Sequence, residues 1–274
     1  ALATTQRVAV VTGSNKGIGY CIAEQLLDSK QFARVIVACR NKELGMEAAA
    51  KLGGEFASLD LADSASIDNF ASFIESPRVG RLDCLVNNGA IAFKDADPTP
   101  FAEQTAPTLR VNYFGTARLT DRLLPLLCAT GENPQVVNVA SMAGRLGQIQ
   151  DPVLRAEFAD PSLTRSRLNE LVHKFENDVA EGAHQERGWG RSNYGFSKLA
   201  VIAYTKMRAR EEMSAGSPVK VNCCCPGYCD TDMTSHRGPR SPAEGACNAV
   251  LLALQPPDGS LNGEFIRDLN CAVW

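Results

Sequence analysis

Short runs of β-branched and apolar residues alternate along the chain with longer segments in which apolar positions recur every three or four residues. The short runs predict seven β-strands, at residues 7–11, 34–38, 55–59, 84–86, 135–139, 219–223 and 263–266. The longer segments predict amphipathic helices, at residues 20–27, 42–52, 66–74, 109–127, 194–213 and 242–254. Because strand and helix alternate, we expect an α/β, Rossmann-type, doubly wound parallel sheet of seven strands with helices on both faces. Residues 1–274 should form a single domain, with ligands at the carboxyl ends of the strands.

One segment, residues 142–193, is much longer than a usual strand-to-helix connection. This segment predicts a helical insertion before the helix at 194–213, with a helix of its own at about residues 163–179. Its apolar positions follow a helical period, at Leu168, Leu171, Val172, Phe175 and Val179. Such a stripe needs a surface to cover, and the helices at 109–127 and 194–213 are the nearest in the chain. The alternative is a symmetric contact with a second copy.

Charge and composition exclude several classes of function. The chain has 274 residues, with 28 basic and 31 acidic residues scattered along it and a formal net charge of −3, so neither a nucleic acid nor a membrane partner is indicated. No apolar stretch reaches the roughly 18 to 20 residues of a membrane span, and we expect a cytoplasmic protein. The ten cysteines predict reduced thiols because none forms a Cys-x-x-Cys pair, and three widely separated histidines do not indicate a metal site.

A glycine-rich turn follows the first predicted strand, with glycines at 13, 17 and 19. Glycines there allow backbone amides to approach a pyrophosphate at a helix N-terminus. Such a turn alone is weak evidence, but its position between the first strand and the first helix favours a nucleotide site. About 20 residues further on, Arg40 stands where an NAD enzyme would place an acidic residue. Arg40 and Lys16 together indicate a site for the 2′-phosphate of NADPH. The alternative is that Arg40 is only a solvated side chain at the end of a strand.

Tyr194 and Lys198 stand one helical turn apart, so their side chains project from the same face of the predicted helix. A nearby ammonium favours the phenolate, and we expect it to lower the tyrosine pKa from about 10 and to ease proton exchange with a substrate oxygen. Ser141 ends the fifth predicted strand and could hold a carbonyl oxygen beside the tyrosine. A Tyr-x-x-x-Lys pair is common by chance, and a serine at a strand end is often only a turn residue.

Taken together, these motifs resemble the short-chain dehydrogenase/reductase family, and within it the monomeric carbonyl reductases, over nearly the whole chain. The resemblance rests on Thr-Gly-Ser-Asn-Lys-Gly-Ile-Gly at 12–19, Asn-Asn-Gly-Ala at 87–90, Asn112, Ser141, Tyr-Gly-Phe-Ser-Lys at 194–198, and Pro226-Gly227 before Thr231. Further similarity lies in residues 91–101, in the long segment before Tyr194 and in Cys-Cys-Pro-Gly at 224–227. One departure is the order Gly89-Ala90, where the family usually has Ala-Gly, which leaves the local backbone conformation open.

The resemblance implies an NADPH-dependent enzyme that reduces ketones, aldehydes or quinones to alcohols, as a monomer. It implies that Tyr194 donates the proton, Ser141 orients the carbonyl, Lys198 binds the nicotinamide ribose, and Asn112 holds a water of a proton relay. The implied cofactor contacts are Gly13, Asn15, Lys16, Gly17, Ile18, Gly19, Arg40, Asp60, Leu61, Asn87, Val111, Tyr194, Lys198, Pro226, Gly227, Thr231 and Met233. Two alternatives stay open: a dedicated steroid, prostaglandin or specialised-metabolite ketone reductase, and a non-enzymatic NADPH-binding regulator.

Three consecutive cysteines precede Pro226. Strand alternation sends Cys223 and Cys225 to one face and Cys224 to the other, so Cys225 is expected near the mouth of the active site. Redox sensitivity there would require a lowered thiol pKa. The alternative is that these are small apolar residues of a strand.

Overall fold

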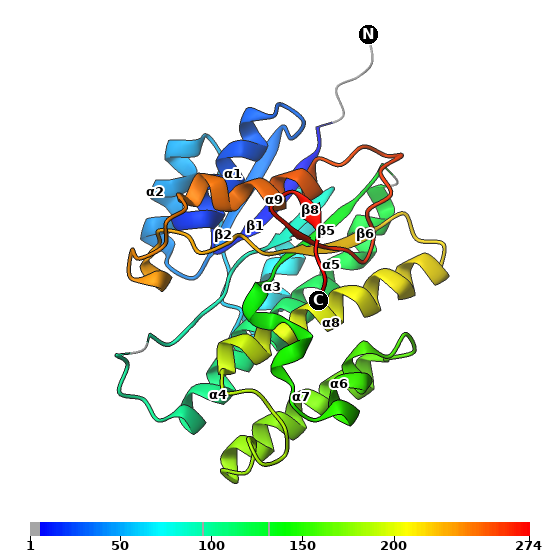
Figure 1. The fold of residues 1–274 in the computed structure, drawn as a ribbon. Coiled ribbons are helices and arrows are strands. Elements are labelled where there is room, and N and C mark those ends of the chain that lie inside the picture. The colour runs from blue at the N-terminus through cyan, green and yellow to red at the C-terminus, as the bar shows by residue number, and fades with distance from the viewer. Residues whose placement is uncertain (1–5, 95, 131) are drawn as a thin grey trace.

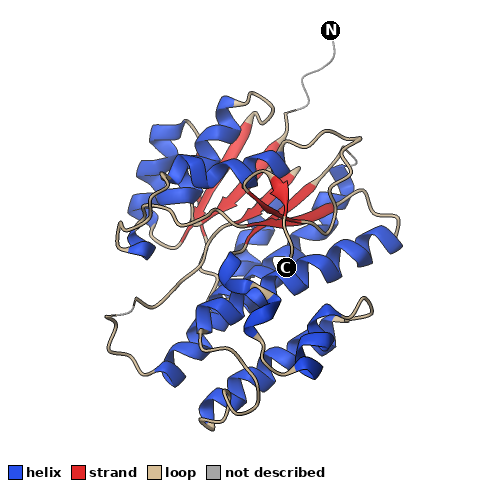
Figure 2. Cartoon of the chain, viewed as in Figure 1, coloured by secondary structure: helices blue, strands red, loops and turns tan. Residues whose placement is uncertain are grey.

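The computed structural model describes residues 6–94, 96–130 and 132–274, which contain one central sheet with helices on both faces (Figures 1 and 2). The strands run in the order β3-β2-β1-β4-β5-β6-β7-β8, and all pairs are parallel except β7 with β8. Their bounds are β1 (Val8–Thr12), β2 (Arg34–Cys39), β3 (Glu55–Ser58), β4 (Cys84–Asn87), β5 (Gln135–Val139), β6 (Lys220–Cys224), β7 (Phe265–Arg267) and β8 (Asn270–Cys271). The fold class is confirmed, and a short eighth strand at the edge of the sheet adds to the seven expected ones.

The strand β8 was missed because it has two residues, both exposed, and no hydrophobic pattern. By contrast, β1 and β4 are buried at every position, as expected for central parallel strands that helices cover on both sides. The described residues form nine α-helices. Their bounds are α1 (Gly17–Asp28), α2 (Lys42–Leu52), α3 (Ser64–Glu75), α4 (Phe101–Leu109), α5 (Thr116–Thr130), α6 (Pro152–Ala159), α7 (Arg165–Ala180), α8 (Asn193–Ser214) and α9 (Pro242–Ala253).

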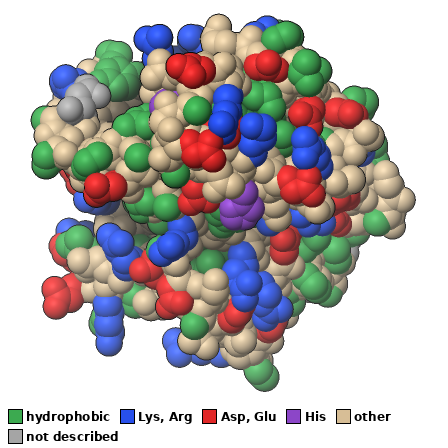
Figure 3. All heavy atoms as spheres, turned by 90° about the horizontal axis from the view of Figure 1, so that it is seen from below, with side chains coloured by type: hydrophobic (Ala, Val, Ile, Leu, Met, Phe, Trp, Pro, Cys, Tyr) green, Lys and Arg blue, Asp and Glu red, His purple; other side chains and the backbone are tan. Residues whose placement is uncertain are grey.

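The helices divide between the two faces of the sheet. On one face α1 lies against α2 and α9, and on the other α3 packs on α5, with α8 beside β5 and β6 (Figure 1). Each face has its own apolar core, in which Ile22 and Leu252 belong to the first and Ile67 and Leu123 to the second. No helix in the described part of the chain is long and apolar enough to cross a membrane. On the face shown in Figure 3, basic and acidic side chains are interspersed.

The predicted insertion forms two helices, α6 and α7, which lie below α8 in Figure 1. The five apolar residues of the predicted stripe on α7 are all buried, and α7 packs against both α4 and α8. Phe175 stacks on Phe196 of α8, with ring centroids 3.8 Å apart. The stripe is therefore covered by this chain's own helices, and none of it remains for a contact with a second copy.

The predicted helix at 109–127 begins earlier and contains an irregularity. It starts with α4, passes through a π-helical segment at Arg110–Gly115, and continues as α5. A π-turn holds one residue more than an α-turn and is frequent at functional sites. Asn112 lies within it.

Candidate active site

A cleft of about 640 Å³ opens at the carboxyl ends of β1 and β4, where the order of the strands reverses. Open α/β sheets bind their ligands at such a switch point. The cleft is lined by most of the residues that the resemblance implied as cofactor contacts. They are Gly13, Asn15, Lys16, Gly17, Ile18, Gly19, Arg40, Asp60, Leu61, Val111, Tyr194, Lys198, Pro226, Thr231 and Met233.

The glycine-rich turn at the base of the cleft requires its glycines. Gly13 has a φ of +65°, and a Cβ there would lie 2.7 Å from the Cα of Gly89. A Cβ on Gly19 would lie 2.4 Å from the side-chain nitrogen of Asn88. Asn88 Nδ2 donates to the carbonyl oxygen of Thr12, 3.0 Å away, and thereby fixes the turn to the end of β4. Asn88 was missed as a site residue, although it belongs to the Asn-Asn-Gly-Ala motif.

The two cations expected at the 2′-phosphate differ in their surroundings. Arg40 is exposed at the end of β2, lines the cleft, and makes no ion pair or hydrogen bond within the described residues. Lys16 instead forms an ion pair with Asp232. Arg40 is thus the cation available for an anionic group at this end of the cleft, and Lys16 must exchange its partner to contribute.

Tyr194 and Ser141 meet at the opposite end of the cleft. Ser141 is the second residue after β5 and caps a short 3₁₀ turn, while Tyr194 lies in the first turn of α8, whose N-cap is Ser192. Interaction of the phenol with the Ser141 hydroxyl lowers the tyrosine pKa. Burial has the larger and opposite effect and raises the pKa of Tyr194 to about 12. The expected lowering by Lys198 is wrong for this structure, and Tyr194 is a protonated phenol at neutral pH.

Lys198 is buried beside that phenol. Its Nζ lies 5.7 Å from the centroid of the Tyr194 ring and donates to the carbonyl oxygen of Val139, 2.7 Å away. Burial lowers the pKa of Lys198 to about 8. The last residue of β5 therefore holds the ammonium near the tyrosine, in the cleft that both residues line.

Asn112 does not line the cleft, and its amide is occupied. Its Oδ1 accepts from the backbone N–H of Ile91 at 2.8 Å, and its Nδ2 donates to the carbonyl oxygen of Ile91 and to Ser197 Oγ. The side chain thus ties the segment after β4 to α8, next to Lys198. A water in a proton relay would have to bind the backbone of Asn112, because the side-chain amide is already hydrogen-bonded.

Two implied cofactor contacts lie outside the cleft lining. Asn87 is buried, and its Nδ2 donates to Thr120 Oγ1 and Asn138 Oδ1, at 2.9 and 2.8 Å. Gly227 has a φ of +86°, and a Cβ there would lie 2.7 Å from Arg240 Nη1. The local backbone conformation and the packing of Arg240 therefore require a glycine at this position. Neither Gly89 nor Ala90 has a positive φ, so the exchanged order causes no strain, and both residues line the cleft.

Sequence reasoning also missed a charged cluster at the mouth of the cleft. His236 bridges Asp230 and Asp232, with Nδ1–Oδ1 and Nε2–Oδ1 distances of 2.7 and 3.0 Å. The two carboxylates raise the pKa of His236. The Thr-Asp-Met sequence at 231–233 marked this loop, but a pattern of single residues does not show which side chains meet.

Cys225 lies beside the active-site segment and is only 3% exposed. Its Sγ accepts from the backbone N–H of Met142 at 3.3 Å and of Gly227 at 3.4 Å. These contacts give the thiol a packing role, and its burial keeps solvent oxidants away. The expected alternation is confirmed, because Cys223 and Cys225 belong to one apolar cluster and Cys224 to another, but Cys225 does not line the cleft. Redox sensitivity stays a prediction.

The cleft fits a phosphorylated dinucleotide. A glycine cradle lies at the N-terminus of α1, the unpaired Arg40 lies at one end, and a tyrosine and a lysine lie at the other, within one continuous groove. Such a groove holds an extended ligand with its reactive end near Tyr194.

Comparison with known proteins agrees with this geometry. The family model for short chain dehydrogenase matches residues 7–157 and 179–241. Carbonyl reductase [NADPH] 1 of Homo sapiens is 39% identical over 277 residues, which cover 97% of this chain and 98% of the human protein.

Two solved structures are also similar. Salutaridine reductase from Papaver somniferum has a TM-score of 0.85 and 31% identity, covering 94% of this chain and 99% of that one. Menthone neomenthol reductase from Mentha piperita has a TM-score of 0.79 and 30% identity, covering 95% and 98%. The fold, the site and these matches agree: the chain belongs to the short-chain dehydrogenase family.

Proposed function

We infer that this protein is an NADPH-dependent carbonyl reductase, which converts ketones, aldehydes or quinones to alcohols. The observation that carries the inference is the buried Lys198 ammonium beside the Tyr194 phenol at one end of the dinucleotide cleft, with the Ser141 hydroxyl interacting with the same phenol. The NADPH in the names of the full-length curated relatives supports the choice of cofactor, as does the unpaired Arg40.

The residues have separate roles in the reaction. NADPH bound in the cleft supplies the hydride that adds to the carbonyl carbon. Ser141 holds the carbonyl oxygen, and Tyr194 donates its phenolic proton to that oxygen, so that the carbonyl becomes a secondary or primary alcohol. Because burial keeps Tyr194 protonated, the phenol is prepared for reduction without a preceding deprotonation. Tyr194 then regains a proton from solvent, while the Lys198 ammonium lies 5.7 Å from the centroid of its ring.

The test is Tyr194→Phe, which keeps the ring and removes the acid. We expect kcat to fall by about two to four orders of magnitude, with the Kd for NADPH nearly unchanged. Single-turnover reduction of an aromatic aldehyde, followed by NADPH absorbance, measures the first quantity, and a fluorescence titration measures the second. Reduction at the parent rate would show that Tyr194 is not the proton donor. A parent protein that binds NADPH without oxidising it would instead be a regulator.

A dedicated specialised-metabolite reductase is the second candidate. It is supported by the two solved structures above, whose names each specify a particular compound. Its chemistry at Tyr194 would be identical, so a substrate panel distinguishes the two. A general reductase accepts many aldehydes and quinones, and a dedicated one strongly prefers a single ketone.

We also infer a cytoplasmic location. All ten cysteines lie in the described part of the chain and are free, and several are buried in the sheet. Free thiols in this number are typical of a reducing compartment.

A further inference from the structure

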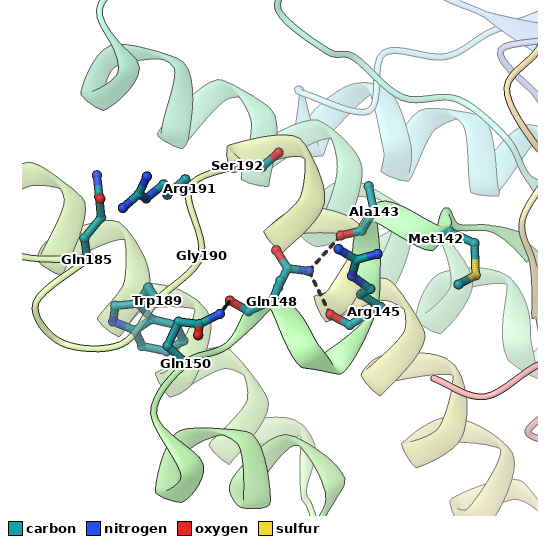
Figure 4. Close-up of a pocket in the computed structure, with 10 residues that line it drawn as sticks. All are labelled: Met142, Ala143, Arg145, Gln148, Gln150, Gln185, Trp189, Gly190, Arg191 and Ser192. Atoms are coloured by element: carbon teal, nitrogen blue, oxygen red, sulfur yellow. Dashed lines mark hydrogen bonds between the residues drawn. The ribbon is translucent and has the colours of Figure 1, made fainter.

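A second pocket, of about 750 Å³, lies beside the first turn of α8 (Figure 4). One wall is the segment that follows Ser141, and the other is the segment that precedes Tyr194. The lining residues are Met142, Ala143, Arg145, Gln148, Gln150, Gln185, Trp189, Gly190, Arg191 and Ser192. A pocket of this volume accommodates a medium-sized organic molecule.

The two walls are held together by direct contacts. Gln148 Nε2 donates to the carbonyl oxygens of Ala143 and Gly195, at 2.8 and 3.2 Å, and so connects one wall to α8. The carbonyl oxygen of Gly188 accepts from the backbone N–H of Gln150 at 2.7 Å. The pocket is therefore formed before any substrate binds.

Its charge is one-sided. Arg145 and Arg191 come from opposite walls, and no aspartate or glutamate belongs to the lining (Figure 4). Neither guanidinium has an ion pair or hydrogen bond within the described residues, whereas nearby Arg167 and Arg187 contact carboxylates. Two cations without counter-charges in one concave surface favour an anionic ligand.

Both arginines are close in sequence to the catalytic pair. Arg145 follows Ser141 by four residues, and Arg191 precedes Tyr194 by three. Met142 adds apolar surface to the same pocket, whereas Trp189, also in the lining, is only 1% exposed. Met142 adjoins Ser141, and Ser192 lies two residues before Tyr194, so a ligand in the pocket can reach toward the reacting carbonyl with one end and toward an arginine with the other.

We propose that Arg145 and Arg191 make the enzyme selective for carbonyl substrates that carry a carboxylate remote from the reacting carbonyl. The proposal rests on the proposed reductase function. Solvated arginines contribute modestly, since exposed ion pairs are weak and salt-sensitive. A charge-assisted contact between the carboxylate and one of these guanidiniums is sufficient to change kcat/KM by about tenfold.

The experiment compares ω-oxo carboxylic acids of increasing chain length with their methyl esters, which keep the aldehyde and remove the charge. We expect the acid to be preferred by about tenfold in kcat/KM at the chain length that spans from Tyr194 to the arginines. The double variant Arg145→Gln, Arg191→Gln should reduce this ratio to near unity, and Arg145→Lys, Arg191→Lys should recover part of it. Raising the salt concentration should lower the ratio in the parent protein.

Lys51→Met is the matched control because it removes one positive charge from the exposed surface of α2. It should leave the ratio of acid to ester unchanged. Equal use of acid and ester by the parent, or a preference that survives loss of both arginines, overturns the proposal. If the parent oxidises NADPH with neither acid nor ester, the reductase function itself fails. Thermal unfolding of each variant confirms that it is folded.

Discussion

Lys16 forms an ion pair with Asp232 across the mouth of the cofactor cleft, joining the glycine-rich turn to the loop after β6. Both side chains are more than half exposed, at 62% and 55%, so the pair itself adds little stability. Its importance lies in competition, because a phosphate of the cofactor and the Asp232 carboxylate require the same ammonium.

We therefore predict that Asp232→Asn tightens NADPH binding severalfold, by releasing Lys16 and removing a negative charge from the cleft. A fluorescence titration at low and high salt measures the effect, which should shrink as salt increases. Glu47→Gln, which breaks the equally exposed pair with Lys51 on α2, should leave the Kd unchanged. Weaker NADPH binding by Asp232→Asn would show that the pair organises the cleft.

Arg40→Asp should reverse the cofactor preference. A charge-assisted contact to the 2′-phosphate contributes roughly 1.5 to 3 kcal/mol, and an aspartate converts it into repulsion. The value of kcat/KM should fall far more with NADPH than with NADH, which lacks that phosphate. Equal losses with both cofactors would instead assign Arg40 a role in the fold.

The buried Lys198 should make stability depend on pH. Its pKa is about 8 in the folded protein against 10.5 as the reference, so between these values the unfolded chain binds more protons. The free energy of unfolding therefore rises with pH in this window, at roughly 1.4 kcal/mol per pH unit. Lys198→Met removes that contribution. Measured by urea unfolding, the free energy of unfolding of the parent should rise by about 2 kcal/mol relative to that of the variant between about pH 7 and pH 9.5. Parallel pH profiles would contradict a lowered pKa.

Gly144 provides a matched test of the contact between the Ser141 segment and α8. A Cβ there would lie 2.6 Å from the carbonyl carbon of Lys198 and 2.7 Å from the backbone nitrogen of Leu199. We expect Gly144→Ala to lower the free energy of unfolding by about 1 to 3 kcal/mol and to reduce kcat, because overpacking separates Ser141 from Lys198. Gly147→Ala, with no atom within 4 Å of the new Cβ, should stay within about 0.5 kcal/mol of the parent. Equal effects of the two changes would refute this explanation.

The protein should be a monomer, because α7 covers the faces of α4 and α8 that would otherwise be free for pairing. Sedimentation at micromolar concentration, with and without NADPH, should give one species near 29.4 kDa. A stable dimer or tetramer would require another interface and would contradict this role of the insertion.

The sequence predicted the strands and the ends of the cleft because these depend on local pattern. A buried β-branched run such as Val8–Thr12 can hardly form anything else, and the glycines at 13 and 19 are required by close backbone contacts. The insertion helix was found for the same reason. Its stripe of apolar residues follows the period of the helix that they form.

The remaining features depend on contacts between distant parts of the chain. The direction in which the Tyr194 pKa shifts results from a balance between burial and the interaction with Ser141, and neither can be read from Tyr-x-x-x-Lys. Asn87 carries a family motif, but its side chain turns into the core toward Thr120 and Asn138. The partnership of Lys16 with Asp232 joins residues 216 positions apart.

The π-helical segment at Arg110–Gly115 has an evolutionary consequence. Because a π-turn takes up one residue more than an α-turn, the pattern of buried positions in the sequence shifts by one across it, while the flanking helices keep their faces. Deleting one residue would restore a regular helix with α4 and α5 in place, and the residues of the wide turn would be displaced. The Asn112 amide would then lose Ile91 or Ser197. Substitutions in this helix can accumulate gradually, but a change in its length would break the connection between the loop after β4 and the catalytic helix in a single step.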